Sequence, residues 1–150
     1  MNGSRKSFWR STANAAETSQ LAAGLAVSLS FPAVILLRGD LGSGKTTFVK
    51  GLVEGLGGDP DLVHSPTFSL VNHYRTSVVE VLHIDLYRLE EAKQQYSIGL
   101  DELLDGDGLI VIEWAEKLRL EVFDPLHIEI EITAHEGRRL TFEGFAESHL

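Results

Sequence analysis

Residues 39–46 have the residue types and the spacing of a loop that binds phosphate groups. The octapeptide fits the pattern G-x-x-x-x-G-K-[ST] at every defined position. Its glycines allow the backbone to curl, so that successive N–H groups can surround a di- or triphosphate at a helix N-terminus. Lys45 would add a positive charge at the outer phosphates, and the Thr46 hydroxyl would be one ligand of a Mg²⁺ ion. The motif predicts a site for a nucleoside triphosphate and magnesium.

Two carboxylates are candidates to complete this site. A phosphate loop needs an acid that holds or orients the metal, and ligands of open α/β sheets collect at the carboxyl ends of the strands. Glu113 ends the apolar stretch 109–112, and Asp85 ends the alternating stretch 81–84. A buried central strand should lie nearer the loop than one arm of a hairpin, so we assign Glu113 to the metal and Asp85 to the γ-phosphate side. The alternative for either residue is a surface acid that follows a strand.

Three further positions near these motifs have two interpretations each. Thr67 lies in the polar loop 65–68, where a nucleotide switch would sense the γ-phosphate and where a proline-marked turn is equally expected. Trp114 would either stack near the nucleotide or fill the core. His83 would be a hydrogen-bonded structural residue or a catalytic one. Both Asp85 and Thr67 are candidates to position an attacking water.

Hydrophobic periodicity predicts the elements that must position these residues. An apolar run over 33–37 predicts a buried strand before the loop, and apolar residues at helical spacing over 48–56 predict a helix after it. Asn14 and Glu17 resemble a capping pair for a helix that ends before Pro32. We further expect hairpins over 69–87 and 126–143, short helices within 89–104, a buried strand over 109–113, a helical turn or two within 114–120, and a loose N-terminal arm over 1–11. The predicted fold class is α/β, a P-loop NTPase-like mixed sheet with a parallel centre, antiparallel hairpin additions and helices on both faces, in one domain over residues 1–150.

The composition narrows the class of protein and its partners. The chain has 150 residues, 43% of them hydrophobic, and its lack of cysteine excludes disulfides and thiolate metal sites. No apolar run approaches the roughly 20 residues of a membrane span, so we expect a cytoplasmic protein with no membrane partner. The formal net charge of −9 opposes strong direct binding to nucleic acid, because nucleic-acid binders usually carry a basic face.

Taken together, four motifs resemble those of a known family. They are residues 39–47, 65–68, 83–88 and 112–114, in that order. The set is similar to the TsaE (YjeE) family, the bacterial ATPase of tRNA threonylcarbamoyladenosine (t6A) synthesis, over about residues 14–145. The phosphate loop is shared with many families, but the set of four is highly specific. One departure is Ala115, where relatives often have proline or glycine.

The resemblance implies binding of ATP and Mg²⁺, and slow ATP hydrolysis coupled to the TsaB–TsaD complex. That complex modifies adenosine 37 of tRNA, so this chain would reach tRNA only indirectly, through its partners. The resemblance makes Lys45 the phosphate ligand, Thr46 and Glu113 the magnesium ligands, Asp85 a residue needed for hydrolysis, and Thr67 part of a switch-like loop. The residues expected to contact the nucleotide are Asp40, Leu41, Gly42, Ser43, Gly44, Lys45, Thr46, Thr47 and Trp114.

Three alternatives share the phosphate loop. A small-molecule kinase normally needs a lid and an acceptor pocket, and the segment 89–107 that would form them is short and acidic. A regulatory GTPase would need a guanine-reading [NT]-K-x-D sequence, which the chain lacks. In the third alternative, bound nucleotide stabilises an assembly without being hydrolysed.

Overall fold

The strands of the protein form one mixed sheet, with helices on both of its faces. The computed structural model describes residues 6–146, and within them seven strands have the order β1-β7-β6-β2-β5-β4-β3. The strands are β1 (Ser7–Thr12), β2 (Ala33–Gly39), β3 (Val71–Arg75), β4 (Glu80–Asp85), β5 (Leu109–Glu113), β6 (Leu126–Ile132) and β7 (Arg138–Glu143). The helices are α1 (Ala15–Ser28), α2 (Lys45–Gly55), α3 (Ala92–Ser97) and α4 (Leu100–Leu103), with single 3₁₀ turns η1 (Pro60–Leu62) and η2 (Ala115–Lys117).

The strands β2, β5 and β4 form what we call the parallel centre of the sheet. β5 pairs in parallel with β2 on one side and with β4 on the other. All five residues of β5 are buried, because helices cover both faces of the sheet at this point. β3 adds to β4 as an antiparallel neighbour. The predicted mixed sheet and its hairpin over 69–87 are therefore confirmed.

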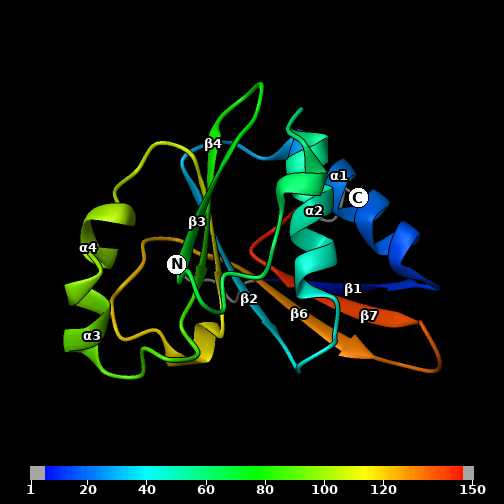
Figure 1. The fold of residues 1–150 in the computed structure, drawn as a ribbon. Coiled ribbons are helices and arrows are strands. Elements are labelled where there is room, and N and C mark those ends of the chain that lie inside the picture. The colour runs from blue at the N-terminus through cyan, green and yellow to red at the C-terminus, as the bar shows by residue number, and fades with distance from the viewer. Residues whose placement is uncertain (1–5, 147–150) are drawn as a thin grey trace.

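Three layers are visible in Figure 1, with α3 and α4 on one side of the sheet and α1 and α2 on the other. Asn14 caps α1 as predicted, since its Oδ1 accepts a hydrogen bond from the Glu17 amide at 2.9 Å. The helices α1 and α2 pack closely because Gly51 and Gly55 of α2 have no side chains there. A Cβ at either glycine would collide with the backbone of α1. This contact fixes α2, and α2 begins at the end of the phosphate loop.

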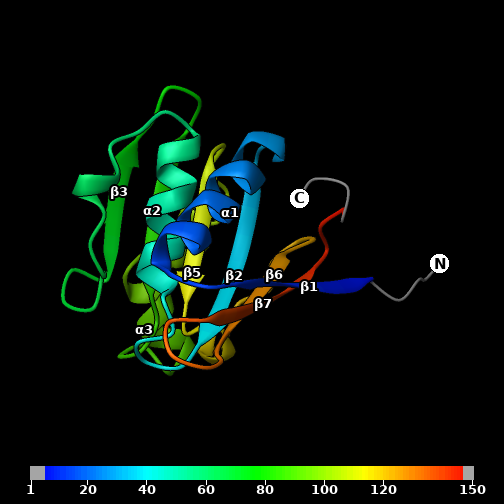
Figure 2. The same ribbon diagram turned by 90° about the vertical axis from the view of Figure 1, so that its right-hand side faces the viewer.

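The strands β6, β7 and β1 form what we call the wing of the sheet. β6 is parallel to β2, and β7 pairs antiparallel with β6 on one side and with β1 on the other. In Figure 2 the strands β1 and β7 turn away from the direction of β2. Alternate residues of β6 and β7 point into the core beneath α1 and α2, among them Ile128, Ile130, Leu140 and Phe142.

The prediction of a loose arm over residues 1–11 is wrong where the structure describes that segment. Residues 7–12 form β1, which pairs with β7 from Ser7 opposite Glu143 to Thr12 opposite Arg138. The ring of Phe8 stacks on Phe142 with centroids 5.2 Å apart. A six-residue edge strand with polar and charged positions gives a weak local signal, and its partner lies more than a hundred residues away in the sequence. Residues 1–5 lie outside the described part of the chain.

Helical segments in the second half of the chain match the predictions approximately. The predicted helix within 89–97 starts at Ala92, and the predicted turn after Trp114 is the 3₁₀ turn Ala115–Lys117. Across residues 6–146, none of the helices has the length and apolar character needed to cross a membrane.

Candidate nucleotide-binding site

The parallel centre brings the phosphate loop and both predicted carboxylates to one edge of the sheet. In the strand register, Leu37 of β2 lies opposite Glu113 of β5, and Glu113 lies opposite Asp85 of β4. The phosphate loop leaves β2 two residues after Leu37. Side chains alternate along a strand, and Leu37 and Val111 belong to the core that contains α2, so Glu113 and Asp85 project on the α2 side. The predicted placement of the two acids beside the loop is thus confirmed in the structure.

The phosphate loop has a backbone that requires glycine. Gly42 and Gly44 have φ values of +79° and +103°, a region that other residues rarely adopt. At Gly39, a Cβ would come within 2.8 Å of the Ile130 carbonyl oxygen and would also collide with Ser43. The Ser43 amide donates to the Asp40 carbonyl at 3.0 Å, which closes the loop into a tight turn.

Lys45 lies folded inside the loop. Its side chain is 7% exposed, and its ammonium group donates to the carbonyl oxygen of Gly39 and lies 3.5 Å from that of Asp40. The same ammonium group lies 4.5 Å from the centre of the Trp114 ring. These carbonyl oxygens are acceptors for the ammonium group, as the oxygens of a phosphate would also be. Trp114 therefore lies beside Lys45 of the phosphate loop, and it also packs against the core on the α3 side of the sheet, so its contact with a nucleotide stays a prediction.

The polar groups of the loop fit a phosphate and a magnesium ion. The Ser43 hydroxyl is buried and is the one buried side-chain oxygen or nitrogen of residues 6–146 without a hydrogen-bond partner. An unpaired buried hydroxyl is costly unless a ligand satisfies it. No group of three or more acidic, His or Cys residues in the described part of the chain could hold a metal by itself. Mg²⁺ is commonly held by one or two protein ligands together with phosphates and water, so Thr46, at the start of α2, and Glu113 suit it.

Asp85 is a buried carboxylate with limited hydrogen bonding. It is 3% exposed, and its Oδ1 accepts a hydrogen bond from the Tyr87 amide at 2.7 Å. Burial raises the pKa of Asp85 above its ordinary value, and the nearby Glu113 carboxylate raises it further, while the Tyr87 amide acts in the opposite direction. A carboxylate with a raised pKa is a stronger base than an exposed one. Asp85 can therefore accept a hydrogen bond or a proton from a group placed beside it.

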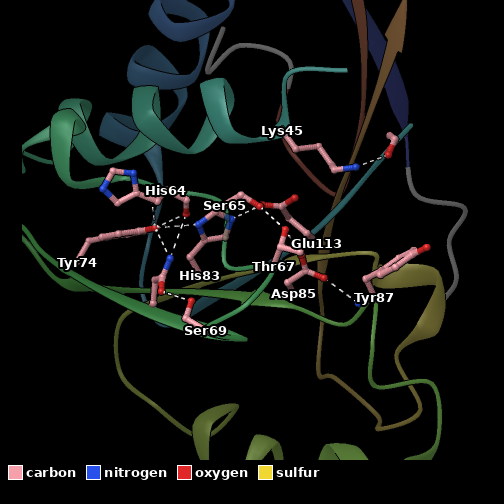
Figure 3. A network of polar contacts seen from close by, with 12 residues as sticks. Lys45, His64, Ser65, Thr67, Ser69, Tyr74, His83, Asp85, Tyr87 and Glu113 are labelled. Carbon is pink, nitrogen blue, oxygen red and sulfur yellow. Dashed lines mark hydrogen bonds and ion pairs between the residues drawn. The ribbon is translucent and has the colours of Figure 1, made fainter. Parts of the chain in front are cut away.

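Thr67 approaches Asp85 from the loop that follows α2 and η1. Its hydroxyl lies 3.5 Å from Asp85 Oδ2 and 2.7 Å from the Ser65 hydroxyl. The loop is a tight turn, since the Leu70 amide donates to the Pro66 carbonyl at 2.7 Å. Figure 3 shows Thr67, Asp85 and Glu113 close to one another, with Lys45 above them in this view. The structure confirms the proline-marked turn, and this turn brings Thr67 to Asp85. The role of Thr67 in sensing a γ-phosphate stays a prediction.

A chain of buried polar contacts connects Glu113 to the start of the same loop. His83 lies between Glu113 Oε2, which contacts its Nε2, and the Tyr74 hydroxyl, which is 3.1 Å from its Nδ1. The Tyr74 hydroxyl in turn donates to the His64 carbonyl at 3.0 Å, and burial raises the pKa of Tyr74. Figure 3 shows this line of residues. His83 is completely buried and orients Glu113, which favours the structural interpretation of the histidine.

The rim of the site is aromatic and apolar. Tyr87 packs on Trp114 with ring centroids 5.0 Å apart. Phe68 is 83% exposed beside Thr67, and Leu41 is 87% exposed within the phosphate loop. Arg88 lies over the Phe68 ring at 4.8 Å. These side chains leave an accessible apolar border around the phosphate-binding edge.

One residue beside the loop has no counterpart among the predicted site residues. Arg138 of β7 donates hydrogen bonds to the carbonyl oxygens of Ser43 and Gly42, at 2.7 and 3.2 Å. Its partners lie about a hundred residues earlier in the chain, and a lone arginine at the start of a strand carries no local signal. The predicted loop residues 40–47 all lie where the motif places them, between β2 and the first turn of α2.

Comparisons of the sequence and of the structure with known proteins identify the same family. A sequence model described as threonylcarbamoyl adenosine biosynthesis protein TsaE matches residues 12–140. The Bacillus subtilis (strain 168) protein named tRNA threonylcarbamoyladenosine biosynthesis protein TsaE is 38% identical over 135 residues, or 89% of this chain and 83% of that protein. The protein of the same name from Rickettsia felis is 41% identical over 128 residues, or 85% and 74%. The crystal structure of Bacillus subtilis YdiB superposes with a TM-score of 0.75 at 31% identity, covering 99% of this chain and 92% of YdiB.

Proposed function

The chain belongs to the TsaE family of tRNA threonylcarbamoyladenosine biosynthesis, and we propose that its role there is to bind ATP with Mg²⁺ and to hydrolyse it. The observation that carries this proposal is the register of the parallel centre. It places Asp85 and Glu113 side by side at the edge where the phosphate loop begins. A loop without neighbouring acids would support binding alone. The two buried carboxylates, one with a raised pKa, favour turnover.

In the proposed reaction, Lys45 and the loop amides hold the β- and γ-phosphates of ATP. The Lys45 ammonium exchanges the carbonyl oxygens of Gly39 and Asp40 for phosphate oxygens. Thr46 and Glu113 would hold the magnesium ion, which would offset negative charge on the phosphate oxygens. His83 keeps the Glu113 carboxylate oriented.

The proposed hydrolysis step is an in-line attack of water on the γ-phosphorus. Asp85, with Thr67 beside it, orients that water and accepts one of its protons as the oxygen–phosphorus bond forms; the proton then passes to the phosphate product or to solvent. The bond between the γ-phosphorus and the bridging oxygen breaks, and the products are ADP and inorganic phosphate. Substituting Asp85 should therefore affect turnover more than binding.

The proposed partners follow from the family and from the charge of the chain. We place the activity in the cytoplasm, coupled to a TsaB–TsaD complex that carries out the threonylcarbamoyl transfer. A net charge of −9 suits a protein that leaves tRNA binding to its partners. The exposed Leu41, Phe68 and Tyr87 at the rim are available for contact with a protein partner.

The test of this function is reconstitution of tRNA modification in several turnovers. The reaction contains tRNA, TsaB–TsaD and the activated threonylcarbamoyl donor, with or without this protein and ATP. We expect modified adenosine to exceed the amount of TsaB–TsaD only when both the protein and hydrolysable ATP are present. Equal yields without the protein would refute the proposal.

A further inference from the structure

Arg138 joins the wing of the sheet to the phosphate loop. Its Nε donates to the Ser43 carbonyl at 2.7 Å, and one terminal nitrogen donates to the Gly42 carbonyl at 3.2 Å. The other terminal nitrogen donates to the Gly137 carbonyl of its own hairpin at 2.8 Å. Every nitrogen of the guanidinium group is therefore engaged with a backbone carbonyl.

The backbone of Arg138 is held on both sides. It lies opposite Ile132 of β6 and opposite Thr12 of β1, so two neighbouring strands flank its position. Its side chain shares a face with Leu140 and Phe142, whose side chains lie in the core beneath α1 and α2. On this face of β7, the guanidinium group reaches the phosphate loop, and α2 begins at the end of that loop. Arg139 points to the opposite face, where its guanidinium carbon lies 4.5 Å from the Trp9 ring centre.

The carbonyl groups that Arg138 holds decide where the loop amides point. In a planar trans peptide the C=O and N–H groups point in opposite directions. The N–H in the same peptide plane as the Ser43 carbonyl belongs to Gly44. An arginine that holds the Ser43 carbonyl on its side therefore turns the Gly44 N–H away from itself. Gly44 has a φ of +103°, which residues with a Cβ rarely adopt. Side-chain sterics therefore do not fix the orientation of the peptide planes on either side of Gly44.

We propose that Arg138 is a positioning residue that sets the Ser43–Gly44 peptide so that the Gly44 N–H faces the bound phosphates. The inference rests on the proposed nucleotide function of the loop. The guanidinium group acts through the backbone and contacts no phosphate in this role. Its fork of donors matches two adjacent carbonyls, whereas a lysine offers a single ammonium on a flexible stem. A lysine at this position would keep the charge and lose the geometry.

The experiment compares the wild-type protein with the Arg138→Met, Arg138→Lys and Arg139→Met variants. Arg139→Met is the matched control, because it removes the same charge from the adjacent residue on the opposite face of β7. Backbone amide spectra of ¹⁵N-labelled protein report the Gly44 resonance, and calorimetric titration gives the Kd for ADP. Thermal unfolding verifies that each variant is folded.

We expect the Gly44 amide resonance to move in both Arg138 variants and to stay in place in Arg139→Met. We also expect ADP to bind about tenfold more weakly to both Arg138 variants, and about as tightly to Arg139→Met as to the wild type. Wild-type behaviour of Arg138→Lys would show that charge alone matters and would overturn the proposal. Unchanged Gly44 resonance or unchanged ADP affinity in Arg138→Met would also overturn it.

The two proposals fail in different ways. If the wild-type protein binds neither ADP nor ATP in the presence of Mg²⁺, the proposed function fails, while the Gly44 resonance still tests the effect of Arg138 on the loop. If the wild type binds ADP and Arg138→Met binds it equally well, the positioning role fails and the nucleotide function stands.

Discussion

The parallel centre and the wing of the sheet face the same phosphate loop with different kinds of groups. The centre contributes two carboxylates, Asp85 and Glu113, whose side chains lie at the ends of strands buried in the sheet. The wing contributes Arg138, whose donors hold backbone carbonyls of the loop. The centre thus supplies the groups that would act on a nucleotide, and the wing shapes the loop that would hold it. Substitutions in the centre should therefore change ATP hydrolysis, whereas substitutions in the wing should change the conformation of the loop or the stability of the fold.

The largest effect is expected at Lys45, which lies at the start of α2, in the loop that both regions face. In Lys45→Met, the phosphate loop loses the one ammonium that lies inside it in the structure. Loss of a preorganised cation in a phosphate-transfer site lowers turnover by at least about a hundredfold. ATP binding by titration calorimetry and phosphate release on the same sample measure the effect. Turnover within a few-fold of the wild type would refute the assignment of Lys45 as the phosphate ligand.

Asp85 should separate binding from hydrolysis. Asp85→Asn keeps an oxygen that can accept from the Tyr87 amide, but it removes the negative charge beside the γ-phosphate side of the site. We expect single-turnover hydrolysis to fall about a hundredfold, with ATP affinity within a few-fold of the wild type. The matched control in the wing is Glu129→Gln, an exposed strand acid that should leave both quantities unchanged. Full hydrolysis by Asp85→Asn would refute the role given to this carboxylate.

Substitution of Phe8 should lower stability and leave nucleotide binding nearly unchanged, because Phe8 packs within the wing. Phe8→Ala removes the ring that stacks on Phe142 of β7 and should lower the free energy of unfolding by about 2 kcal/mol. Below the unfolding transition, ADP affinity should stay within about twofold of the wild type. Trp9→Ala, on the exposed face of the same strand, is the control and should cost less stability. A large loss of ADP affinity in folded Phe8→Ala would erase the distinction between the two regions.

The smallest expected effect is a pH-dependent difference in stability at Asp85. Burial raises the pKa of this carboxyl in the folded chain above the ordinary value of 3.8. The protonated form therefore favours the fold, and this contribution is complete below pH 3.8 and is lost as pH rises through the raised value. Asp85→Asn does not ionise, so its Tm relative to the wild type should increase over that range and then level off. A relative Tm that falls with increasing pH would contradict the burial effect.

The centre of the fold could be predicted from the sequence because its signals are local. The run 109–113 is apolar up to Glu113, and the pattern in 39–46 is specific over eight residues. Asn14 and Glu17 lie three residues apart and cap the first helix as expected. In each case the interacting residues, or the alternation that reveals them, lie within one short segment. The identity of the catalytic candidates follows from that local information.

The hairpin predicted over 126–143 is confirmed as β6 and β7 of the wing. The edge strand β1 and the inner contacts of the site could not be predicted, because they depend on register between distant segments. The β1 strand is recognisable only once β7 is beside it, since Phe8 alone does not specify a strand. The contact of His83 with Glu113 requires β4 to lie beside β5, a pairing that spacing along the chain does not fix. Arg138 reaches Ser43 only because β7 folds back toward the loop. Such contacts are properties of the tertiary fold.

The most direct test of the central claim is ATP hydrolysis in ¹⁸O-labelled water, measured by mass spectrometry of the products. The claim is that the centre of the sheet directs water onto the γ-phosphorus of ATP. The account predicts Mg²⁺-dependent release of inorganic phosphate that carries one ¹⁸O atom from water, with unlabelled ADP, and loss of this product in Asp85→Asn. Transfer of the γ-phosphate to another acceptor, or label in ADP, would contradict it.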